Sequence, residues 1–182
     1  MLTRTMSLLS RFLFLAAFGF LNSCASMRVT DFAFCRPAFR PMEFFAGHTS
    51  SSGVIETRGG TPMRIVQTET SGRREGETLK IEQDISVSGS KPQHRSWQIR
   101  QLDAHRYEAT ANDILGPVRG EAYGNVFHWE FTVALSPGNP LENVRFSQWM
   151  YLQPDGTTMV NHSTIRKFGI VVAQVTEEFS KR

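Results

Sequence analysis

The sequence predicts an all-β protein whose folded part is one antiparallel up-and-down barrel. Apolar and polar residues alternate with a period of two, which is the pattern of half-buried strands. Turn-forming residues separate the alternating runs, and no window of 11 or more residues after position 42 keeps a helical stripe. Many consecutive strands leave exposed edges unless the sheet closes, and closure removes those edges. A sandwich of two sheets is the alternative architecture.

Length and composition agree with one globular domain. The chain has 182 residues, of which 40% are hydrophobic and 20% are charged, so disorder, collagen and coiled coil are excluded. Two cysteines cannot build a disulfide framework. The formal net charge is +3, and removal of Arg4 and Arg11 with the segment described next leaves +1. The charge therefore gives no indication of nucleic-acid binding.

Residues 1–23 have the pattern of a secretory signal helix. Arg4 and Arg11 form a positive start, and an apolar run extends from Phe12 to Leu21. That run is shorter than the roughly 20 residues that span a membrane, and it fits the apolar part of a signal peptide. An uncleaved N-terminal anchor is the alternative.

The segment Leu21-Asn22-Ser23-Cys24 resembles the lipobox of bacterial lipoproteins. The resemblance implies that Cys24 receives a diacylglycerol and an N-terminal acyl chain, and several chains anchor a protein stably because each buried CH₂ contributes about 0.8 kcal/mol. Ala25 follows the cysteine, which by the same analogy favours the periplasmic face of the outer membrane. Simple export to the periplasm and anchoring in the inner membrane are the alternatives. Residues 24–42 are predicted to form a lipidated N-terminus and an extended tether, in which Cys35 receives no role.

Residues 43–182 are predicted to form the barrel domain. The clearest strand runs from Phe127 to Leu135, where one face is aromatic and aliphatic and the other is mostly polar. The predicted strands, in chain order, are Met63–Thr70, Leu79–Val87, His94–Leu102, Arg106–Ala111, Val118–Tyr123, Phe127–Leu135, Val144–Leu152, Thr157–Arg166 and Ile170–Phe179. Glycine, proline, serine and asparagine clusters between these runs, such as Ser136 to Pro140, tolerate positive φ or fix a bend and so predict turns.

A set of short motifs from Phe44 to the C-terminus carries a family resemblance. They are Phe44-Phe45-Ala46-Gly47, Gly53, Gly76, Leu79, Glu82, Arg95-Ser96-Trp97-Gln98-Ile99, Tyr107, Ala109, Asn112-Asp113-Ile114-Leu115-Gly116, Gly120-Glu121-Ala122-Tyr123-Gly124-Asn125, Trp129, Trp149-Met150-Tyr151, Asn161 and Arg166-Lys167-Phe168-Gly169-Ile170. In these motifs the chain resembles an uncharacterised family of bacterial lipoproteins, a domain of unknown function with a lipocalin-like barrel. The resemblance implies a surface-anchored, single-domain protein with no assigned enzymatic activity.

The chain departs from that family's pattern at two places. Ser147-Gln148 stands where the family tends to have an acidic pair, and Asn161-His162 stands where it has an Asn-Arg pair. The Gly-x-Trp motif that opens true lipocalins is also missing at Ala46-Gly47-His48-Thr49. "Lipocalin-like" therefore describes the expected shape only.

No motif predicts a metal, a cofactor or a catalytic residue. None of the five histidines has a His, Cys or carboxylate partner at a recognised metal spacing. The sequence contains no G-x-S-x-G and no glycine-rich phosphate cradle. The Asn112-Asp113 pair is typical of a turn or a hydrogen-bonded corner.

Arg95 and Trp97 fall on one face of the same predicted strand. One interpretation is that Arg95 holds a ligand carboxylate against an apolar wall formed partly by Trp97. The other is that Trp97 fills the barrel while Arg95 pairs with an acid such as Glu82 or Asp113. With these two, Tyr107, Trp129 and Trp149 complete the candidate ligand-binding residues.

Together these observations predict a non-catalytic, membrane-anchored periplasmic lipoprotein that binds or carries a lipid or another small hydrophobic molecule. Its partners would be a membrane, through the lipid on Cys24, and that ligand. One alternative is an envelope protein whose filled barrel docks to a protein partner through an exposed apolar patch. Another is an enzyme acting on lipids or isoprenoids, which requires convergent polar groups with shifted pKa values in a pocket.

Overall fold

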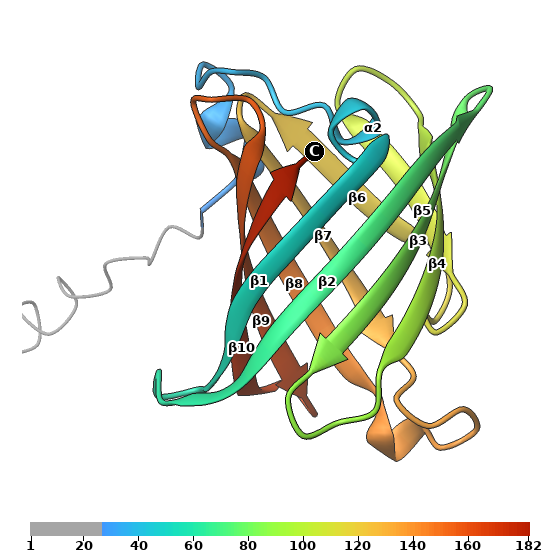
Figure 1. Cartoon of the computed structure of the whole chain (residues 1–182), viewed down its shortest axis with the longest axis vertical. Coiled ribbons are helices and arrows are strands. Elements are labelled where there is room, and N and C mark those ends of the chain that lie inside the picture. The colour runs from blue at the N-terminus through green and yellow to red at the C-terminus, as the bar shows by residue number, and fades with distance from the viewer. Residues whose placement is uncertain (1–26) are drawn as a thin grey trace, which may run out of the picture.

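The computed structural model describes residues 27–182, which form ten strands closed into one antiparallel barrel (Figure 1). Each strand pairs with the next along the chain, and the first pairs with the last, so the prediction of an all-β up-and-down barrel is confirmed. The strands are β1 (Gly47–Thr57), β2 (Pro62–Glu75), β3 (Thr78–Val87), β4 (Gln93–Gln101), β5 (Arg106–Ala111), β6 (Val118–Tyr123), β7 (Val126–Val133), β8 (Val144–Leu152), β9 (Thr158–Lys167) and β10 (Ile170–Lys181). Short helical turns are η2 (Val29–Phe32), α2 (Pro41–Phe44) and η3 (Pro140–Glu142).

The predicted signal segment 1–23 and the lipidation site Cys24 lie outside the described residues and stay predictions. No helix in the described part of the chain has the length and apolar character needed to cross a membrane.

The hydrophobic alternation located nine of the strands. The bounds of β5, β6 and β8 are those predicted, whereas the run from Phe127 ends at Val133 rather than Leu135, which is exposed. The strand missing from the prediction is β1. Its inward residues near the start are Thr49 and Ser51, which are buried but polar, so no alternation of apolar and polar residues marks this strand.

Residues 28–46 close one end of the barrel, and we refer to this segment as the plug. Phe39, Met42, Phe44 and Phe45 are each 3–5% exposed, and the Phe39 N–H donates to the Gly124 carbonyl at 2.7 Å. The prediction of an extended tether over residues 24–42 is therefore wrong for its described part, which folds against the barrel. The physical reason is that burial of the aromatic side chains of this segment in the open end of the barrel removes apolar surface from water, which lowers the free energy of the folded state.

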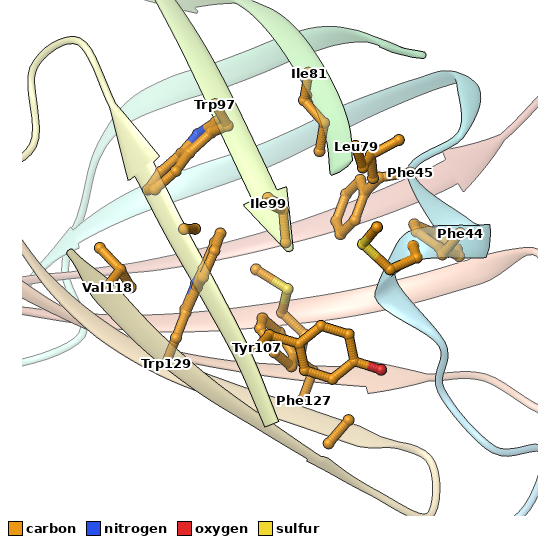
Figure 2. Close-up of a cluster of buried hydrophobic side chains, with 14 of the residues drawn as sticks. Phe44, Phe45, Leu79, Ile81, Trp97, Ile99, Tyr107, Val118, Phe127 and Trp129 are labelled. Atoms are coloured by element: carbon orange, nitrogen blue, oxygen red, sulfur yellow. The ribbon is translucent and has the colours of Figure 1, made fainter. Parts of the chain in front are cut away.

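The two ends of the barrel are different. Because β1 starts at the plug and the strands alternate in direction, the turns β1–β2, β3–β4, β5–β6, β7–β8 and β9–β10 all lie at the opposite end, which we call the mouth. Side chains of the core fill the barrel at the plug end, where Phe45 lies beside Leu79 (Figure 2), and the core continues along the barrel to Phe131 and Val133. Residues 27–182 thus contain the ten strands of the closed barrel, the plug and one hydrophobic core, which are the features of a domain that folds as a unit.

Candidate functional site

A cavity of about 170 Å³ occupies the interior of the barrel between the plug and the mouth. Phe45 of the plug lines its inner end, and Ile55, Val87 and Gln93, beside the mouth turns, line its outer end. The lining side chains are buried in the middle of the barrel and become partly exposed toward the mouth. The cavity is therefore reached from the mouth and closed at the plug.

Two tryptophans form one wall of the cavity. Trp97 on β4 stacks on Trp129 on β7 with ring centroids 4.8 Å apart and an angle of 23° between the planes, and both point into the barrel (Figure 2). Strands β5 and β6 lie between them in the sheet and turn small residues inward, including Ala109 and Gly120, which leaves room for the indoles to meet. Trp97 and Trp129 therefore take the interior positions that alternation predicted.

Glutamine side chains fix both indoles. The Trp97 Nε1–H donates to Gln83 Oε1 at 2.9 Å, and the Trp129 Nε1–H donates to Gln148 Oε1 at 2.6 Å. A buried indole N–H needs such a partner, and these bonds hold the rings in one orientation. The aromatic wall is consequently pre-organised for packing against a ligand.

The opposite wall is polar and centres on Glu177 of β10, which is 8% exposed. Its Oε1 accepts hydrogen bonds from the Ser51 hydroxyl at 2.9 Å and the Thr68 hydroxyl at 3.3 Å, and its Oε2 accepts one from Asn161 Nδ2 at 3.4 Å. Burial raises the pKa of the Glu177 carboxyl, and the bonds from Ser51, Asn161 and Thr68 act in the opposite direction. A buried carboxyl that lines a cavity is a candidate binding group.

The polar wall continues across the barrel as a chain of hydrogen bonds. Asn161 Nδ2 also donates to Ser163 Oγ at 3.1 Å, and Gln148 Nε2 donates to the same oxygen at 3.0 Å. Through Gln148 the chain reaches the Trp129 indole. The aromatic and polar walls are therefore parts of one connected site.

Sequence reasoning missed Glu177, although a signal for it was present. Glu177 lies two residues from Val175 and two from Phe179, so the period of a strand places all three on one face. Both apolar neighbours are buried, which puts the carboxyl inside.

Arg95 lines the cavity, but its guanidinium is already paired. Nε and Nη2 each donate to the Asp113 carboxylate at 2.7 Å, and Nε also reaches the second oxygen at 3.0 Å. Of the two interpretations of Arg95, the pairing with Asp113 is confirmed, and no free guanidinium waits for a ligand carboxylate. The Arg95 guanidinium carbon also lies 5.8 Å from the Trp97 ring centroid and 6.0 Å from that of Phe131.

The two remaining candidate residues lie away from the cavity. Tyr107 points inward but packs edge-on against Phe127 at 5.5 Å in the core, where burial raises the pKa of its phenol. Trp149 lies on the outer surface, because the alternation along β8 turns Gln148 and Met150 inward. Its ring packs against His128 at 4.2 Å and against Phe32 of the plug at 6.5 Å. The prediction that Trp149 contacts an interior ligand is therefore wrong.

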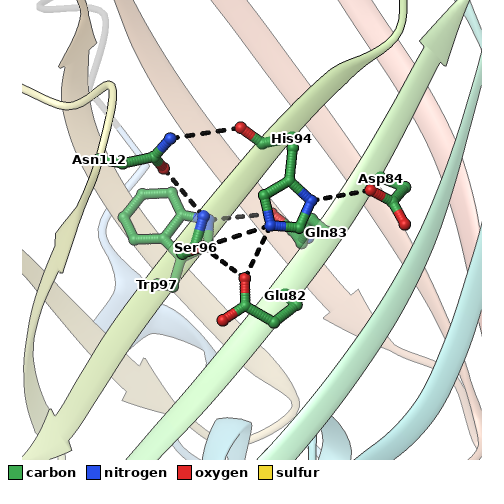
Figure 3. A network of polar contacts seen from close by, with 7 residues as sticks. All are labelled: Glu82, Gln83, Asp84, His94, Ser96, Trp97 and Asn112. Atoms are coloured by element: carbon green, nitrogen blue, oxygen red, sulfur yellow. Dashed lines mark hydrogen bonds and ion pairs between the residues drawn. The ribbon is translucent and has the colours of Figure 1, made fainter.

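A serine, a histidine and an aspartate meet on the outer face of β3 and β4 (Figure 3). His94 Nδ1 lies 2.8 Å from Asp84, and its Nε2 lies 2.9 Å from Glu82 and 3.4 Å from Ser96 Oγ. These contacts with Asp84 and Glu82 raise the pKa of His94, and Ser96 donates to Glu82 rather than to the imidazole. In a catalytic triad the serine hydroxyl donates to the histidine, whereas here it donates to Glu82, so this exposed group is a surface ion-pair cluster.

Residues 27–182 contain no group of three or more His, Cys, Asp and Glu side chains arranged to hold a metal ion. The predicted absence of a metal and of a cofactor stays a prediction. Cys35 is exposed and unpaired within the described residues.

Comparisons with known proteins identify a family and one similar fold, and they assign no activity to this chain. The model of a family described as "Protein of unknown function (DUF3833)" matches residues 18–181. A search of the curated proteins finds no match. Among solved structures, the S-type phycobiliprotein lyase CPES from Guillardia theta is similar with a TM-score of 0.54 and 7% sequence identity, over 78% of this chain and 90% of that chain. A redesigned β-barrel, mFAP1, bound to DFHBI is similar with a TM-score of 0.42 and 12% identity, over 79% of this chain and 100% of that chain. The first similarity shows the lipocalin-like fold alone.

Proposed function

Because the chain belongs to a family of proteins of unknown function, DUF3833, we propose its function from the barrel itself: it binds a small hydrophobic molecule in its interior without transforming it. The observation that carries this proposal is the cavity of about 170 Å³ between the stacked Trp97–Trp129 pair and Glu177. A mostly apolar cavity with a few fixed polar groups is the usual form of a small-molecule site.

The cavity also bears on the two alternatives. The alternative of an envelope protein that acts only through its surface predicts a filled barrel, whereas this barrel contains a cavity that opens toward solvent. An enzyme acting on lipids would need a nucleophile activated by a base beside the ligand. Within the described residues no histidine, cysteine or lysine lines the cavity, and the Thr68 and Ser163 hydroxyls and the Glu177 carboxyl that do are hydrogen-bonded within the polar wall. Binding is accordingly the function that this interior supports best.

Membrane anchoring through Cys24 in the periplasmic face of the outer membrane is part of the proposal. The resemblance of Leu21–Cys24 to a lipobox supports it. Four residues separate Cys24 from Val29, the first buried residue of the plug, and they span at most about 3.6 Å each. A lipid on Cys24 would hold the plug end near the membrane and leave the mouth turned away from it.

The anchor can be tested separately from the cavity. In a bacterial host, the full chain should carry the added mass of acyl chains and sediment with membranes, whereas Cys24→Ser should lack that mass and be released. Cys35→Ser is the matched control, because an exposed cysteine of the plug should not affect lipidation. An unmodified wild-type chain would overturn the anchoring proposal.

Binding can be tested on the chain from residue 27 with two neutral probes, ethylbenzene and 2-phenylethanol. A bound probe should change the fluorescence of Trp97 and Trp129 and raise the Tm, because a ligand at 100 times its Kd stabilises the folded state by about 2.7 kcal/mol. Ile165→Trp, which places an indole in the cavity near the mouth, should abolish both effects, and the outer-surface control Trp149→Phe should keep them. The proposal fails if neither probe binds, or if Ile165→Trp binds both as the wild type does.

A further inference from the structure

Glu177 is a buried carboxyl without an opposite charge. It makes no salt bridge within residues 27–182, and its side chain is almost fully buried. Arg95 is the one basic side chain among the described cavity-lining residues, and Asp113 already neutralises it. An unpaired buried charge is costly, so such a carboxyl is kept either protonated or beside a cation.

The hydrogen bonds of Glu177 leave one of its oxygens largely free. Oε1 accepts two hydroxyl donors, Ser51 and Thr68, whereas Oε2 accepts only the long bond of 3.4 Å from Asn161. A carboxylate oxygen can accept two hydrogen bonds. Oε2 can therefore accept another donor.

We propose that the ligand is a compact hydrophobic amine, whose ammonium group pairs with Glu177 and whose apolar body packs against the Trp97–Trp129 wall. This rests on the proposed binding function and names the class of ligand. An ammonium supplies the positive charge that the cavity lacks and up to three N–H donors for Oε2. A carboxylate ligand would instead bring a second negative charge toward Glu177 with no free cation to meet it.

A cation already lies against the aromatic wall. Rings of Trp and Phe attract a cation placed within about 6 Å of the ring centroid. The guanidinium of Arg95 already lies 5.8 Å from Trp97 and 6.0 Å from Phe131, so these rings face a positive group in the empty protein. Because Arg95 already takes this position, the ammonium of the ligand pairs with Glu177 on the opposite wall, and only the apolar body of the ligand contacts the rings.

The size of the cavity limits the apolar body. An apolar cavity of about 150 Å³ holds benzene, and this one measures about 170 Å³. A benzene-sized body with a short aminoalkyl arm fits, and a longer chain would have to extend through the mouth.

The proposal also requires a pH dependence. Strands β1, β2 and β9 turn uncharged side chains toward Glu177, namely Ser51, Thr68 and Asn161. The other described charged groups at the cavity are Arg95 and its partner Asp113, which form a salt bridge with each other. Burial raises the pKa of the Glu177 carboxyl, so wherever the ligand-free carboxyl is still protonated, binding of an ammonium ion releases that proton to solvent. The affinity for the amine should therefore rise with pH above 4.5 and level off once the carboxyl of the empty protein is ionised.

The test uses three probes of similar shape on the chain from residue 27: 2-phenylethylamine, 2-phenylethanol and phenylacetate. Calorimetry at pH 7 should show that the wild type binds the amine at least about tenfold more tightly than the alcohol, as expected for one charge-assisted bond. Phenylacetate should bind most weakly. Glu177→Gln should lose the preference for the amine while still binding the alcohol, and Glu178→Gln, on the outer face of the same strand, should behave as the wild type.

The outcomes separate this inference from the proposed function. If the alcohol or phenylacetate binds as tightly as the amine, or if Glu177→Gln keeps the preference, the amine proposal is overturned and the hydrophobic site stands. If none of the three binds to the wild type, both proposals fail. Should Glu177→Gln not fold, calorimetry of the wild type in two buffers of different ionisation enthalpy decides, when it is run in the pH range above 4.5 where the affinity for the amine is expected to rise. Proton release on amine binding in that range supports the proposal, and its absence overturns it.

Discussion

His94 and His128 show how the barrel gives one residue type two opposite environments. His94 lies on the outer surface between Asp84 and Glu82, and both carboxylates stabilise its protonated form. His128 is half-buried, contacts Ser147 Oγ at 3.2 Å and stacks near Trp149. The carboxylates raise the pKa of His94, whereas burial lowers the pKa of His128.

NMR titration of the two imidazoles should therefore give one pKa on each side of the ordinary value of 6.5, with His94 above and His128 below. In the double variant Asp84→Asn with Glu82→Gln, the pKa of His94 should fall while that of His128 stays unchanged. The stability that His94 contributes is complete below pH 6.5 and is lost as the pH rises through its folded-state pKa. A pKa of His94 that is lower than the pKa of His128 would contradict the structure.

Phe168 occupies a backbone conformation that suits asparagine or glycine better. Its φ is 52°, that of Gly169 is 80°, and the two residues form the tight turn between β9 and β10. The Phe168 side chain is 74% exposed, so it gains little from packing. For a non-glycine residue this left-handed conformation costs about 1–2 kcal/mol.

Phe168→Asn should therefore increase the free energy of unfolding by about 1 kcal/mol, because asparagine is favoured in such turns. Urea denaturation measures this change. Leu141→Asn is the control, since Leu141 is similarly exposed but has an ordinary φ, and it should change stability by less than about 0.5 kcal/mol. Equal stabilities of Phe168→Asn and the wild type would show that the turn carries no strain.

Glu177 makes the stability of the empty protein depend on pH. Because its folded-state pKa is raised above 4.5, the folded protein holds a proton that the unfolded chain has already released. Stability then falls as the pH rises from 4.5 through the folded-state pKa. Glu177→Gln has no carboxyl to lose a proton. The free energy of unfolding of this variant minus that of the wild type should therefore increase between pH 4.5 and 8, by about 1.4 kcal/mol for each unit by which the pKa is raised. A difference that is constant with pH would contradict this account.

At the scale of elements, the plug closes one end of the barrel, so the cavity opens only at the mouth. Phe45 packs edge-on against Phe44 at 5.1 Å and Phe179 at 6.3 Å, and it also lines the cavity. Phe45→Ala should lower the free energy of unfolding by about 3–5 kcal/mol, the usual cost of removing a buried aromatic ring. Phe34→Ala, in the same segment but 93% exposed, should have almost no effect. Chemical denaturation of both variants tests the plug, and similar losses would mean that it is only loosely attached.

The sequence predicted the elements better than the site, for a physical reason. Alternation of apolar and polar residues reports on burial, so it located β2 to β10 and placed Trp97 and Trp129 inside. It could not show that these rings stack, because their contact depends on the closure of the barrel and the small residues between them. It did not detect β1, because the inward residues near the start of this strand, Thr49 and Ser51, are polar. The prediction placed Trp149 inside the barrel, although alternation along β8 turns this residue outward.

At the scale of the whole molecule, the mouth is the apolar end of the surface. Of the eleven large hydrophobic side chains that are exposed in residues 27–182, eight lie at the mouth. These are Met63, Ile65, Leu115, Leu135, Leu141, Phe168, Ile170 and Val172. Exposed apolar groups gathered at one place mark a surface that meets apolar molecules. The hydrophobic ligand that we propose would therefore reach the cavity past a ring of exposed apolar side chains.

Closure of the barrel depends on the seam between the first and last strands. Gly53 of β1 pairs with Glu177 of β10, and a Cβ at Gly53 would lie 2.2 Å from the Thr176 carbonyl oxygen and 2.5 Å from Glu177 Cγ. Backbone at that distance cannot move aside without opening the seam. Gly53→Ala should therefore lower the free energy of unfolding by about 1–3 kcal/mol, the usual cost of overpacking.

The matched control for the seam is Gly59→Ala, in the turn after β1, where the nearest atom to an added Cβ is Thr57 Oγ1 at 3.8 Å. Urea denaturation should leave this control close to the wild type, while near-UV circular dichroism follows the stacked Trp97–Trp129 pair in both. Because Gly53 lies opposite Glu177, Gly53→Ala should disturb the polar wall more than the aromatic wall. The near-UV signal of the tryptophan pair should therefore persist, while the pH dependence of the free energy of unfolding becomes weaker. Equal stabilities of the two alanine variants would mean that the barrel tolerates a wider seam than the structure shows.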